Sequence, residues 1–242
     1  MKAIIFAAGL GTRLKPITDT MPKAMVPIAG KPLLWHTIQK LKASSFDEII
    51  INVHHFADQI IDYVKANNSF GIRIEFSDER EKLLDTGGGI KKASWFFDDN
   101  KPFLIHNVDI LSNIDLRNLY EIHTQNNSIA TLVVSERETS RYFLFNENNH
   151  LVGWINEKTG EIKSPYSNLD SSIYRKLAFS GIHIIHPQIF SYFNLFPDKF
   201  SIVDFYLSIC DKEKIHGYIP KSLQLIDVGK ITSITEAENF IK

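Results

Sequence analysis

Cysteine is almost absent from this sequence, and long apolar runs are missing altogether. Cys210 is the only cysteine among 242 residues, which excludes an intramolecular disulfide and a cluster of thiolate metal ligands. No stretch of about 18 consecutive apolar residues occurs, so we expect neither a membrane-spanning helix nor a cleavable signal segment. A single cysteine suits a reducing compartment, and we expect a cytoplasmic protein.

An excess of charge of either sign is also lacking. The 27 Lys and Arg residues balance 28 Asp and Glu residues, for a formal net charge of −1. Because no global field attracts nucleic acid or an anionic membrane, we expect neither as a partner. Any anionic substrate has to be bound by a local group of cations.

What the sequence does contain is 44% hydrophobic and 23% charged residues, a composition typical of a folded globular chain. Its first half alternates apolar runs of strand length with segments of helical periodicity. This order predicts an α/β fold with a parallel sheet covered by helices. We expect strands at residues 3–7, 48–53, 72–76 and 102–106, and helices at 32–41, 56–64 and 88–95.

The second half has a different pattern, in which strands are more frequent than helices. It predicts an antiparallel or mixed extension that forms the wall of a pocket. We expect one domain over residues 1–242 with two subregions, 1–135 and 136–242, and too few residues after the last helix for a further domain. The expected elements are helices at 115–125, 202–209 and from 232, and strands at 130–134, 142–145, 151–155, 178–185, 215–218 and 223–226.

A glycine-rich turn directly follows the first buried strand. Gly9 and Gly11 let the backbone approach a phosphate, and successive N–H groups in such a turn bind anions. A dinucleotide fingerprint needs glycine where Leu14 stands, so hydride transfer is disfavoured, and the Gly-Lys-Ser/Thr of a P-loop is missing. Arg13 and Lys23 flank the turn, and two cations beside a phosphate cradle favour transfer at phosphorus. The alternative is an ordinary tight turn with solvated cations.

These segments resemble the opening signature of the sugar-1-phosphate nucleotidyltransferases. The likeness is carried by Ala-Ala-Gly-Leu-Gly-Thr-Arg-Leu at 7–14, Pro-Lys-Ala-Met-Val-Pro at 22–27 and Gly-Lys-Pro-Leu at 30–33, and it extends over nearly the whole chain. The family joins an NTP to a sugar 1-phosphate and releases pyrophosphate. The resemblance implies a Rossmann-like, glycosyltransferase-A-like fold, in which a mostly parallel sheet flanked by helices carries a mixed-strand, sugar-binding extension.

The same resemblance implies roles for the residues of the opening segments. Ala24 stands where the family usually has proline after the lysine, a mild departure because Lys23 itself is present. The implied catalytic cations are Arg13 and Lys23, and the implied triphosphate contacts are Ala8, Gly9, Gly11 and Thr12.

Two carboxylates far apart in the sequence are candidate metal ligands. Asp109 follows the fourth expected strand, and ligands of open α/β sheets collect beyond the carboxyl ends of strands. The triplet Asn107-Val108-Asp109 resembles the family's Asn-Gly-Asp, and we expect ordinary φ values at Val108. Asp227 resembles the second metal-binding carboxylate, although Lys230 replaces a usual threonine. The resemblance implies Asp109 as catalytic, Asn107 as a substrate contact, and Mg²⁺ held by both carboxylates; a turn cap is the alternative for each aspartate.

A second glycine-rich segment precedes the third expected helix. Its sequence, Asp85-Thr86-Gly87-Gly88, is most similar to segments of the N-acetylmuramate 1-phosphate uridylyltransferases and the heptose-phosphate guanylyltransferases. The resemblance implies that these four residues contact the base of the nucleotide. The alternative is a flexible helix entry with Asp85 or Thr86 as its N-cap.

The sugar-phosphate end of the reaction also requires a cation. Glu157 and Lys158 end a predicted strand and resemble the family's Glu-Lys-Pro, which implies Lys158 as the phosphate ligand and Glu157 as a sugar contact. Ser180 and Gly181 lie in a segment similar to one where the family's backbone meets the sugar. A solvated strand end and close strand packing are the respective alternatives.

The sequence therefore predicts an enzyme that condenses an NTP, with UTP favoured, and a sugar 1-phosphate. Residues 1–135 would bind the nucleotide and residues 136–242 the sugar phosphate. A guanylyl- or cytidylyltransferase for mannose 1-phosphate, heptose 1-phosphate or phosphocholine is the first alternative. A non-catalytic nucleotide-binding protein is the second, because of the departures at Val108 and Lys230. We expect core or surface roles for the nine histidines, since none has metal-ligand spacing.

Overall fold

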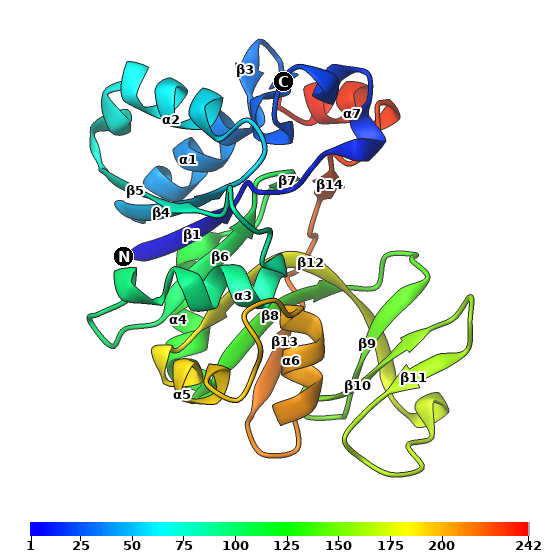
Figure 1. The fold of residues 1–242 in the computed structure, drawn as a ribbon. Coiled ribbons are helices and arrows are strands. Elements are labelled where there is room, and N and C mark those ends of the chain that lie inside the picture. Colours follow the sequence, from blue (N-terminus) through cyan, green and yellow to red (C-terminus); the bar gives the residue numbers. More distant parts are fainter. Residues whose placement is uncertain (242) are drawn as a thin grey trace.

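The computed structural model describes residues 1–241 and confirms the α/β architecture, with helices on both sides of a mixed ten-stranded sheet (Figure 1). The strands are β1 (Lys2–Phe6), β2 (Pro27–Ile28), β3 (Lys31–Pro32), β4 (Glu48–Val53), β5 (Arg73–Asp78), β6 (Phe103–Asn107), β7 (Ile110–Ser112), β8 (Ala130–Ser135), β9 (Arg141–Phe145), β10 (Leu151–Asn156), β11 (Glu161–Lys163), β12 (Arg175–Ile185), β13 (Ile215–Tyr218) and β14 (Leu225–Asp227). The helices are α1 (Leu33–Ala43), α2 (Ala57–Ala66), α3 (Asp85–Lys92), α4 (Leu116–Asn126), α5 (Phe190–Phe193), α6 (Ile202–Ile209) and α7 (Thr232–Ile241).

The large sheet has a parallel half and a mixed half. Its main strand order is β11-β10-β9-β12-β6-β1-β4-β5, and β8 pairs with both β12 and β13. Strands β6, β1, β4 and β5 run parallel, as predicted from the first half of the sequence. Strand β12 runs antiparallel to β6 and joins the two halves, while β9, β10 and β11 project to one side as the predicted extension (Figure 1).

Both faces of the parallel strands are covered, which explains why these strands are apolar throughout. In β1, Ala3 and Ile5 join a buried cluster with residues of α1, α2 and α7, whereas Ile4 joins a second cluster with residues of α3 and α6. Figure 1 shows α1 and α2 on one side of the sheet and α3 and α6 on the other. The core therefore forms two layers separated by the sheet.

The third helix starts earlier than the sequence predicts. Helix α3 begins at Asp85 and ends at Lys92, not at residues 88 and 95. Glycine has a low intrinsic helix propensity, but the N–H groups of Gly87 and Gly88 donate to the carbonyl oxygen of Phe200, at 2.9 and 3.3 Å. Tertiary packing thus stabilises a helical turn that local propensity disfavours.

Strand β7 was not expected from the sequence, and it determines where β14 lies. The expected strand at 223–226 is shifted to Leu225–Asp227, because Ile226 pairs with Leu111 and Asp227 with Ile110 of β7. This two-stranded ladder brings the segment around Asp227 next to the residues that follow β6.

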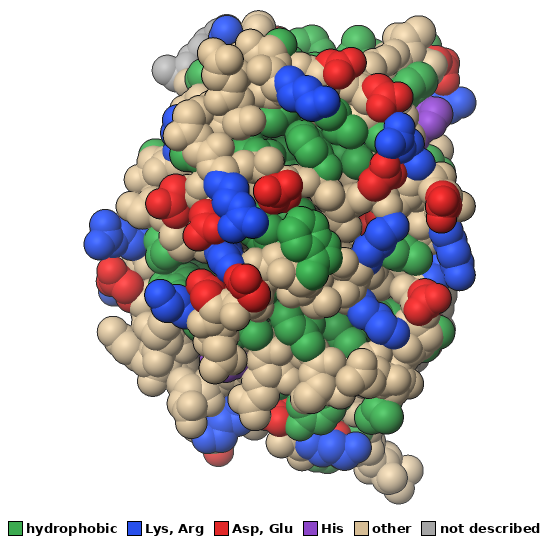
Figure 2. Space-filling view, turned by 60° about the vertical axis from the view of Figure 1, so that its left-hand side comes forward, with side chains coloured by type: hydrophobic (Ala, Val, Ile, Leu, Met, Phe, Trp, Pro, Cys, Tyr) green, Lys and Arg blue, Asp and Glu red, His purple; other side chains and the backbone are tan. Residues whose placement is uncertain are grey.

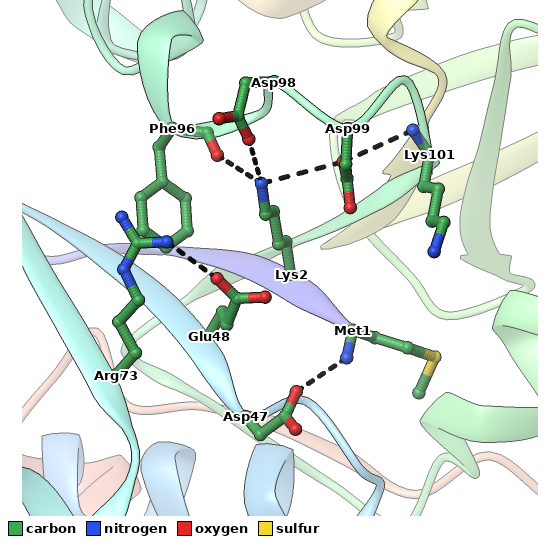
Figure 3. Close-up of polar contacts among 9 residues, drawn as sticks. All are labelled: Met1, Lys2, Asp47, Glu48, Arg73, Phe96, Asp98, Asp99 and Lys101. Atoms are coloured by element: carbon green, nitrogen blue, oxygen red, sulfur yellow. Dashed lines mark hydrogen bonds and ion pairs between the residues drawn. The ribbon is translucent and has the colours of Figure 1, made fainter.

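At the amino ends of the parallel strands, charged side chains are paired with one another and with a backbone carbonyl (Figure 3). The buried amine of Lys2 donates to the carbonyl oxygen of Phe96 at 2.8 Å and pairs with Asp98. Arg73 pairs with Glu48 at 2.8 Å and lies over the Phe96 ring, 4.9 Å from its centroid. Lys2 and Arg73 thus make their hydrogen bonds and ion pairs within the molecule.

The surface carries charges of both signs. On the face shown in Figure 2, Lys and Arg side chains are interspersed with Asp and Glu side chains, and apolar side chains lie between them. No continuous area of one sign dominates this face. Within residues 1–241, no helix has the length and apolar character needed to cross a membrane.

Candidate active site

A cavity of about 550 Å³ lies at the carboxyl ends of β1, β4 and β6. The sequence-predicted phosphate and cation residues that line it are Ala8, Gly9, Gly11, Thr12, Arg13 and Lys23. Four further predicted residues line it as well, namely Asp85, Thr86, Asn107 and Asp109. The structure thus brings together segments that are up to about a hundred positions apart in the sequence, at the sheet edge where ligands of open α/β folds collect.

The glycine-rich turn after β1 needs glycine at Gly11. Its φ is +65°, and a Cβ there would lie 2.9 Å from Cγ2 of Thr18 and 3.3 Å from Cβ of Lys23. The Thr18 hydroxyl donates to the Gly11 carbonyl oxygen at 2.8 Å and holds the turn in place. By contrast, a Cβ on Gly9 would meet nothing within 4 Å, because this residue borders open space.

Asn52 supports the turn from the neighbouring strand β4. Its Oδ1 accepts the N–H groups of Ala7 and Ala8, at 2.6 and 3.2 Å. Its Nδ2 donates to Glu79 at 3.0 Å, and the other Glu79 oxygen accepts the N–H of Leu84 at 3.1 Å. This network links the phosphate turn to the start of α3. Ala8, a predicted substrate contact, therefore already donates its N–H within the protein.

Sequence reasoning missed both Asn52 and Glu79, although each lines the cavity. Asn52 lies in β4 near its carboxyl end, and Glu79 directly follows β5. Both could have been found from their positions, because each is a polar residue at the carboxyl end of a strand. The same kind of position identified Asp109 as a candidate. Lys199, which lines the cavity from the loop before α6, gave no such signal.

Two cations approach the carboxylates of the site, Arg13 from the end of the glycine-rich turn and Lys23 from the short helical segment Lys23–Met25. Lys23 is 9% exposed and forms an ion pair with Asp109. The Arg13 guanidinium lies over the backbone of Gly229, where a Cβ would be 2.9 Å from Nη2. Because glycine at position 229 has no Cβ, the Arg13 guanidinium can occupy this space.

Asp227 ends β14 and does not line the cavity, but it lies close to Asp109, the residue that precedes β7. Val228 donates its N–H to the Asp109 carbonyl oxygen at 2.9 Å. Desolvation and the Asp109 charge raise the pKa of Asp227, and the charges of Lys23, Arg13 and Arg137 oppose that shift. Within residues 1–241 no group of three or more His, Cys, Asp or Glu side chains could hold a metal ion. Two carboxylates suit a Mg²⁺ that takes its remaining oxygen ligands from water and phosphate.

Val108 between Asn107 and Asp109 fits without strain. Its φ is not positive, as expected, and its side chain is buried among core residues. Its N–H donates to the Phe6 carbonyl oxygen at 3.1 Å, and its own carbonyl accepts the hydroxyl of Thr37 at 3.3 Å. The valine therefore preserves the turn that presents Asp109. Nothing in the structure explains Lys230.

The glycines of α3 pack against the chain itself, away from the cavity. A Cβ on Gly87 would overlap the Phe200 ring, and one on Gly88 would overlap the Asp198 carbonyl oxygen. The hydroxyl of Thr86 accepts the N–H of Ile202 at 3.0 Å. Asp85 and Thr86 line the cavity, whereas Gly87 and Gly88 support its wall from behind.

The predicted sugar-side residues separate into two groups. Gly181 lies directly against Asn107, since a Cβ at Gly181 would overlap the Asn107 amide, and Ser180 beside it is buried. Glu157 and Lys158 lie in the turn after β10 and do not line the cavity. The Glu157 carboxylate is 3.1 Å from the amine of Lys176.

The buried histidines have structural surroundings, as expected. His106 and His183 are enclosed in the core, and desolvation lowers the pKa of His106 to about 4 and that of His183 to about 3. Both rings are therefore neutral at physiological pH. Neither ring nitrogen of His183 makes a hydrogen bond within residues 1–241.

Comparison with known proteins identifies the same family as the sequence motifs. Residues 2–242 match the family model described as "Nucleotidyl transferase". UTP–glucose-1-phosphate uridylyltransferase of Synechocystis sp. is 29% identical over 98% of this chain and 62% of its own length. N-acetylmuramate alpha-1-phosphate uridylyltransferase of Caulobacter vibrioides is 43% identical over 44% of this chain and 45% of its own length. The chain thus spans less than two thirds of these curated relatives.

A solved structure of similar size has the same fold. The structure of HddC from Yersinia pseudotuberculosis complexed with GMP-PN superposes with a TM-score of 0.77 at 26% sequence identity. The match covers 100% of this chain and 99% of that chain. The similarity thus includes both the parallel half and the mixed half of the fold.

Proposed function

Since the chain belongs to the nucleotidyl transferase family, we propose that it transfers a nucleotidyl group from an NTP to a sugar 1-phosphate. The observation that carries this proposal is the cavity at the strand ends, which Arg13, Lys23 and Asp109 line. Asp227 lies behind them, close enough to interact with the charges of all three. Cations beside a glycine-rich turn suit a triphosphate, and an acidic pair suits the metal that accompanies it.

The reaction that fits this site is an in-line displacement at the α-phosphorus. A phosphate oxygen of the sugar 1-phosphate forms a new bond to the α-phosphorus of the NTP. The bond from that phosphorus to the oxygen that bridges the α- and β-phosphates breaks, and pyrophosphate leaves with that oxygen. The attacking oxygen is already an anion, so no proton has to be removed and no general base is required.

The chain's own residues bind and orient the phosphates. The N–H groups of the turn around Gly9, Gly11 and Thr12 would hold the triphosphate, because such concave turns bind anions. Arg13 and Lys23 would neutralise the charge that grows on the leaving pyrophosphate. Asp109 and Asp227 would hold Mg²⁺, which supplies electrostatic stabilisation of phosphate oxygens when it is bound.

The two subregions would divide the substrates between them. Residues 1–135 would hold the nucleotide, with Asp85 and Thr86 at the base, and residues 136–242 would supply most sugar contacts. UTP is our first candidate, supported by the uridylyltransferases among the relatives. GTP is the second, favoured by the full-length likeness to the structure that contains GMP-PN.

The test is pyrophosphate release with Mg²⁺, measured over all pairs of UTP, GTP, CTP, dTTP and ATP with a panel of acceptors. The panel contains the 1-phosphates of N-acetylmuramate, mannose, glucose and heptose, together with phosphocholine. Release that requires one NTP and one sugar phosphate together supports the proposal and identifies both substrates. NTP binding without release for any acceptor contradicts it and favours a binding protein.

A further inference from the structure

The cation expected to bind the sugar phosphate does not line the cavity. Lys158 follows β10, and the strand order β6-β12-β9-β10 places that strand three positions from β6. At about 4.8 Å between neighbouring strands, this amounts to roughly 14 Å across the sheet. The neighbouring Glu157 pairs with Lys176, not with any residue of the cavity wall. A cation nearer to the parallel half is therefore a further candidate for the acceptor side.

Arg137 does not line the cavity itself, but its charge acts on Asp227, and β8, which it follows, is one strand nearer to β6 than β10 is. It follows β8, and its Nη2 donates to the carbonyl oxygen of Phe179 at 3.0 Å. Phe179 belongs to β12, the strand that pairs directly with β6. Neither the sequence motifs nor the family signature assigned a role to Arg137.

A bulge in β12 connects Arg137 to the cavity wall. Phe179 of β12 pairs with Val134 of β8, and His183 of β12 pairs with Leu132 of β8. The step is four residues on β12 but only two on β8, so β12 contains two extra residues that form a bulge. Gly181 lies in this bulge with a φ of +77° and contacts the amide of Asn107, which lines the cavity. The bulge thus places the carbonyl that holds Arg137 within two residues of the contact with Asn107.

The charge of Arg137 is not neutralised by an ion pair. Within residues 1–241 no carboxylate lies within 4.0 Å of its guanidinium, whereas Arg175 pairs with Glu136 at 3.1 Å. A guanidinium has five N–H donors in a planar fork, and here the contact with Phe179 uses one nitrogen. The rest of the fork suits two oxygens of a phosphate group.

We propose that Arg137 binds the phosphate of the sugar 1-phosphate and orients its oxygen toward the α-phosphorus. This inference rests on the proposed function, because it assigns the acceptor subsite of that reaction. The Phe179 carbonyl holds the guanidinium in place before the acceptor arrives, which reduces the entropy lost on binding. Since Arg13 and Lys23 serve the triphosphate, Arg137 acts on acceptor affinity and not on nucleotide affinity.

Steady-state kinetics of matched variants tests this assignment. We expect Arg137→Gln to raise KM for the sugar 1-phosphate by about tenfold or more, the effect of losing a charge-assisted phosphate contact, with KM for the NTP changed less than about twofold. Arg137→Lys should recover part of the affinity, because it keeps the charge but loses the fork. Arg175→Gln, which removes a nearby exposed guanidinium, is the matched control and should match wild type. Lys158→Gln tests the sequence-based candidate and should have a smaller effect than Arg137→Gln.

Isothermal titration of wild type and Arg137→Gln with the same sugar 1-phosphates separates this inference from the proposed function. Normal acceptor KM and affinity in Arg137→Gln, or equal losses for acceptor and NTP, would overturn the inference while the function stands. Binding that depends on Arg137 in a wild-type protein without turnover would retain the subsite and remove the function. Absence of acceptor binding to wild type would overturn both.

Discussion

The two ends of the parallel strands carry charges in opposite arrangements. At the amino ends, Lys2 and Arg73 are matched by carbonyl and carboxylate oxygens of the same chain (Figure 3). At the carboxyl ends, Lys23 pairs with Asp109, but this pair and Arg13 border a cavity of about 550 Å³. Charges of similar kind therefore stabilise the fold at one end and are available to a ligand at the other.

The largest expected effect is on catalysis, at the carboxyl end. Lys23→Ala removes a buried cation beside the triphosphate turn, and we expect turnover to fall by about 10³-fold, as when an electrostatic contact to a reacting group is lost. Circular dichroism should show an unchanged fold. Asp109→Asn should lower turnover similarly. A near-normal rate in either variant would remove that residue from the mechanism.

The next largest effect concerns the support of the cavity wall. In Gly88→Ala the new Cβ would overlap the Asp198 carbonyl oxygen, and we expect a loss of about 2–4 kcal/mol in the free energy of unfolding, measured with urea. Gly9→Ala is the matched variant, because its Cβ meets nothing within 4 Å. We expect Gly9→Ala to keep its stability but to bind the NTP more weakly. Equal stabilities of the two variants would contradict this distinction.

A smaller effect is expected at the amino end. Lys2→Met keeps the apolar stem but leaves the buried Phe96 carbonyl oxygen without its donor, which should cost about 1–3 kcal/mol of stability. Turnover should stay at the wild-type value, in contrast to Lys23→Ala. The comparison between the two ends fails if Lys2→Met reduces turnover while its stability is normal.

The smallest effect is a pH dependence that originates in the core. Burial lowers the pKa of His183 from 6.5 to about 3. Between pH 3 and pH 6.5, His183 is therefore protonated in the unfolded chain but neutral in the folded chain. Stability is thus fully present above pH 6.5 and is lost as the pH falls toward 3. At pH 5.5 the loss is about 1.4 kcal/mol. In His183→Phe the drop in unfolding free energy between pH 7 and 5.5 should shrink by about 1.2 kcal/mol, since a small part of the loss is already present at pH 7, and an unchanged drop would contradict the burial effect.

The parallel half of the fold was predictable because its signals are local. Apolar runs such as residues 48–53 lie on strands covered on both faces, and the expected helix at 202–209 matches α6. The predicted start of α3 was wrong, because the residue that stabilises its glycines is Phe200, which lies more than a hundred positions away in the sequence. Strand β7 was missed because three residues carry too little periodicity to be detected.

The candidate site was predictable where motifs report directly on a ligand. The turn residues and Asp109 line the cavity, since short glycine-rich segments fix their own geometry. Motifs did not predict the roles of residues that act through tertiary packing. Gly87 and Gly88 resemble base contacts by sequence but pack against residues 198–200, and Asn52 acts through hydrogen bonds to another strand.

One wall of the cavity is tied to its surroundings by hydrogen bonds along its length, whereas the other is held on both sides of a short open tip. Residues 84–88 and 198–202 are joined by hydrogen bonds from Gly87 to Phe200, from Phe200 to Leu84 and from Ile202 to Thr86. In the opposite turn, Asn52 holds Ala8 and Thr18 holds Gly11, but open space lies beside Gly9 between them. The tied wall has to move as one unit, so the exit of the nucleotide-linked product of the proposed reaction would depend on the tip of the turn at residues 9–10. Amide hydrogen exchange should therefore be slow at the start of α3 and fast at this tip.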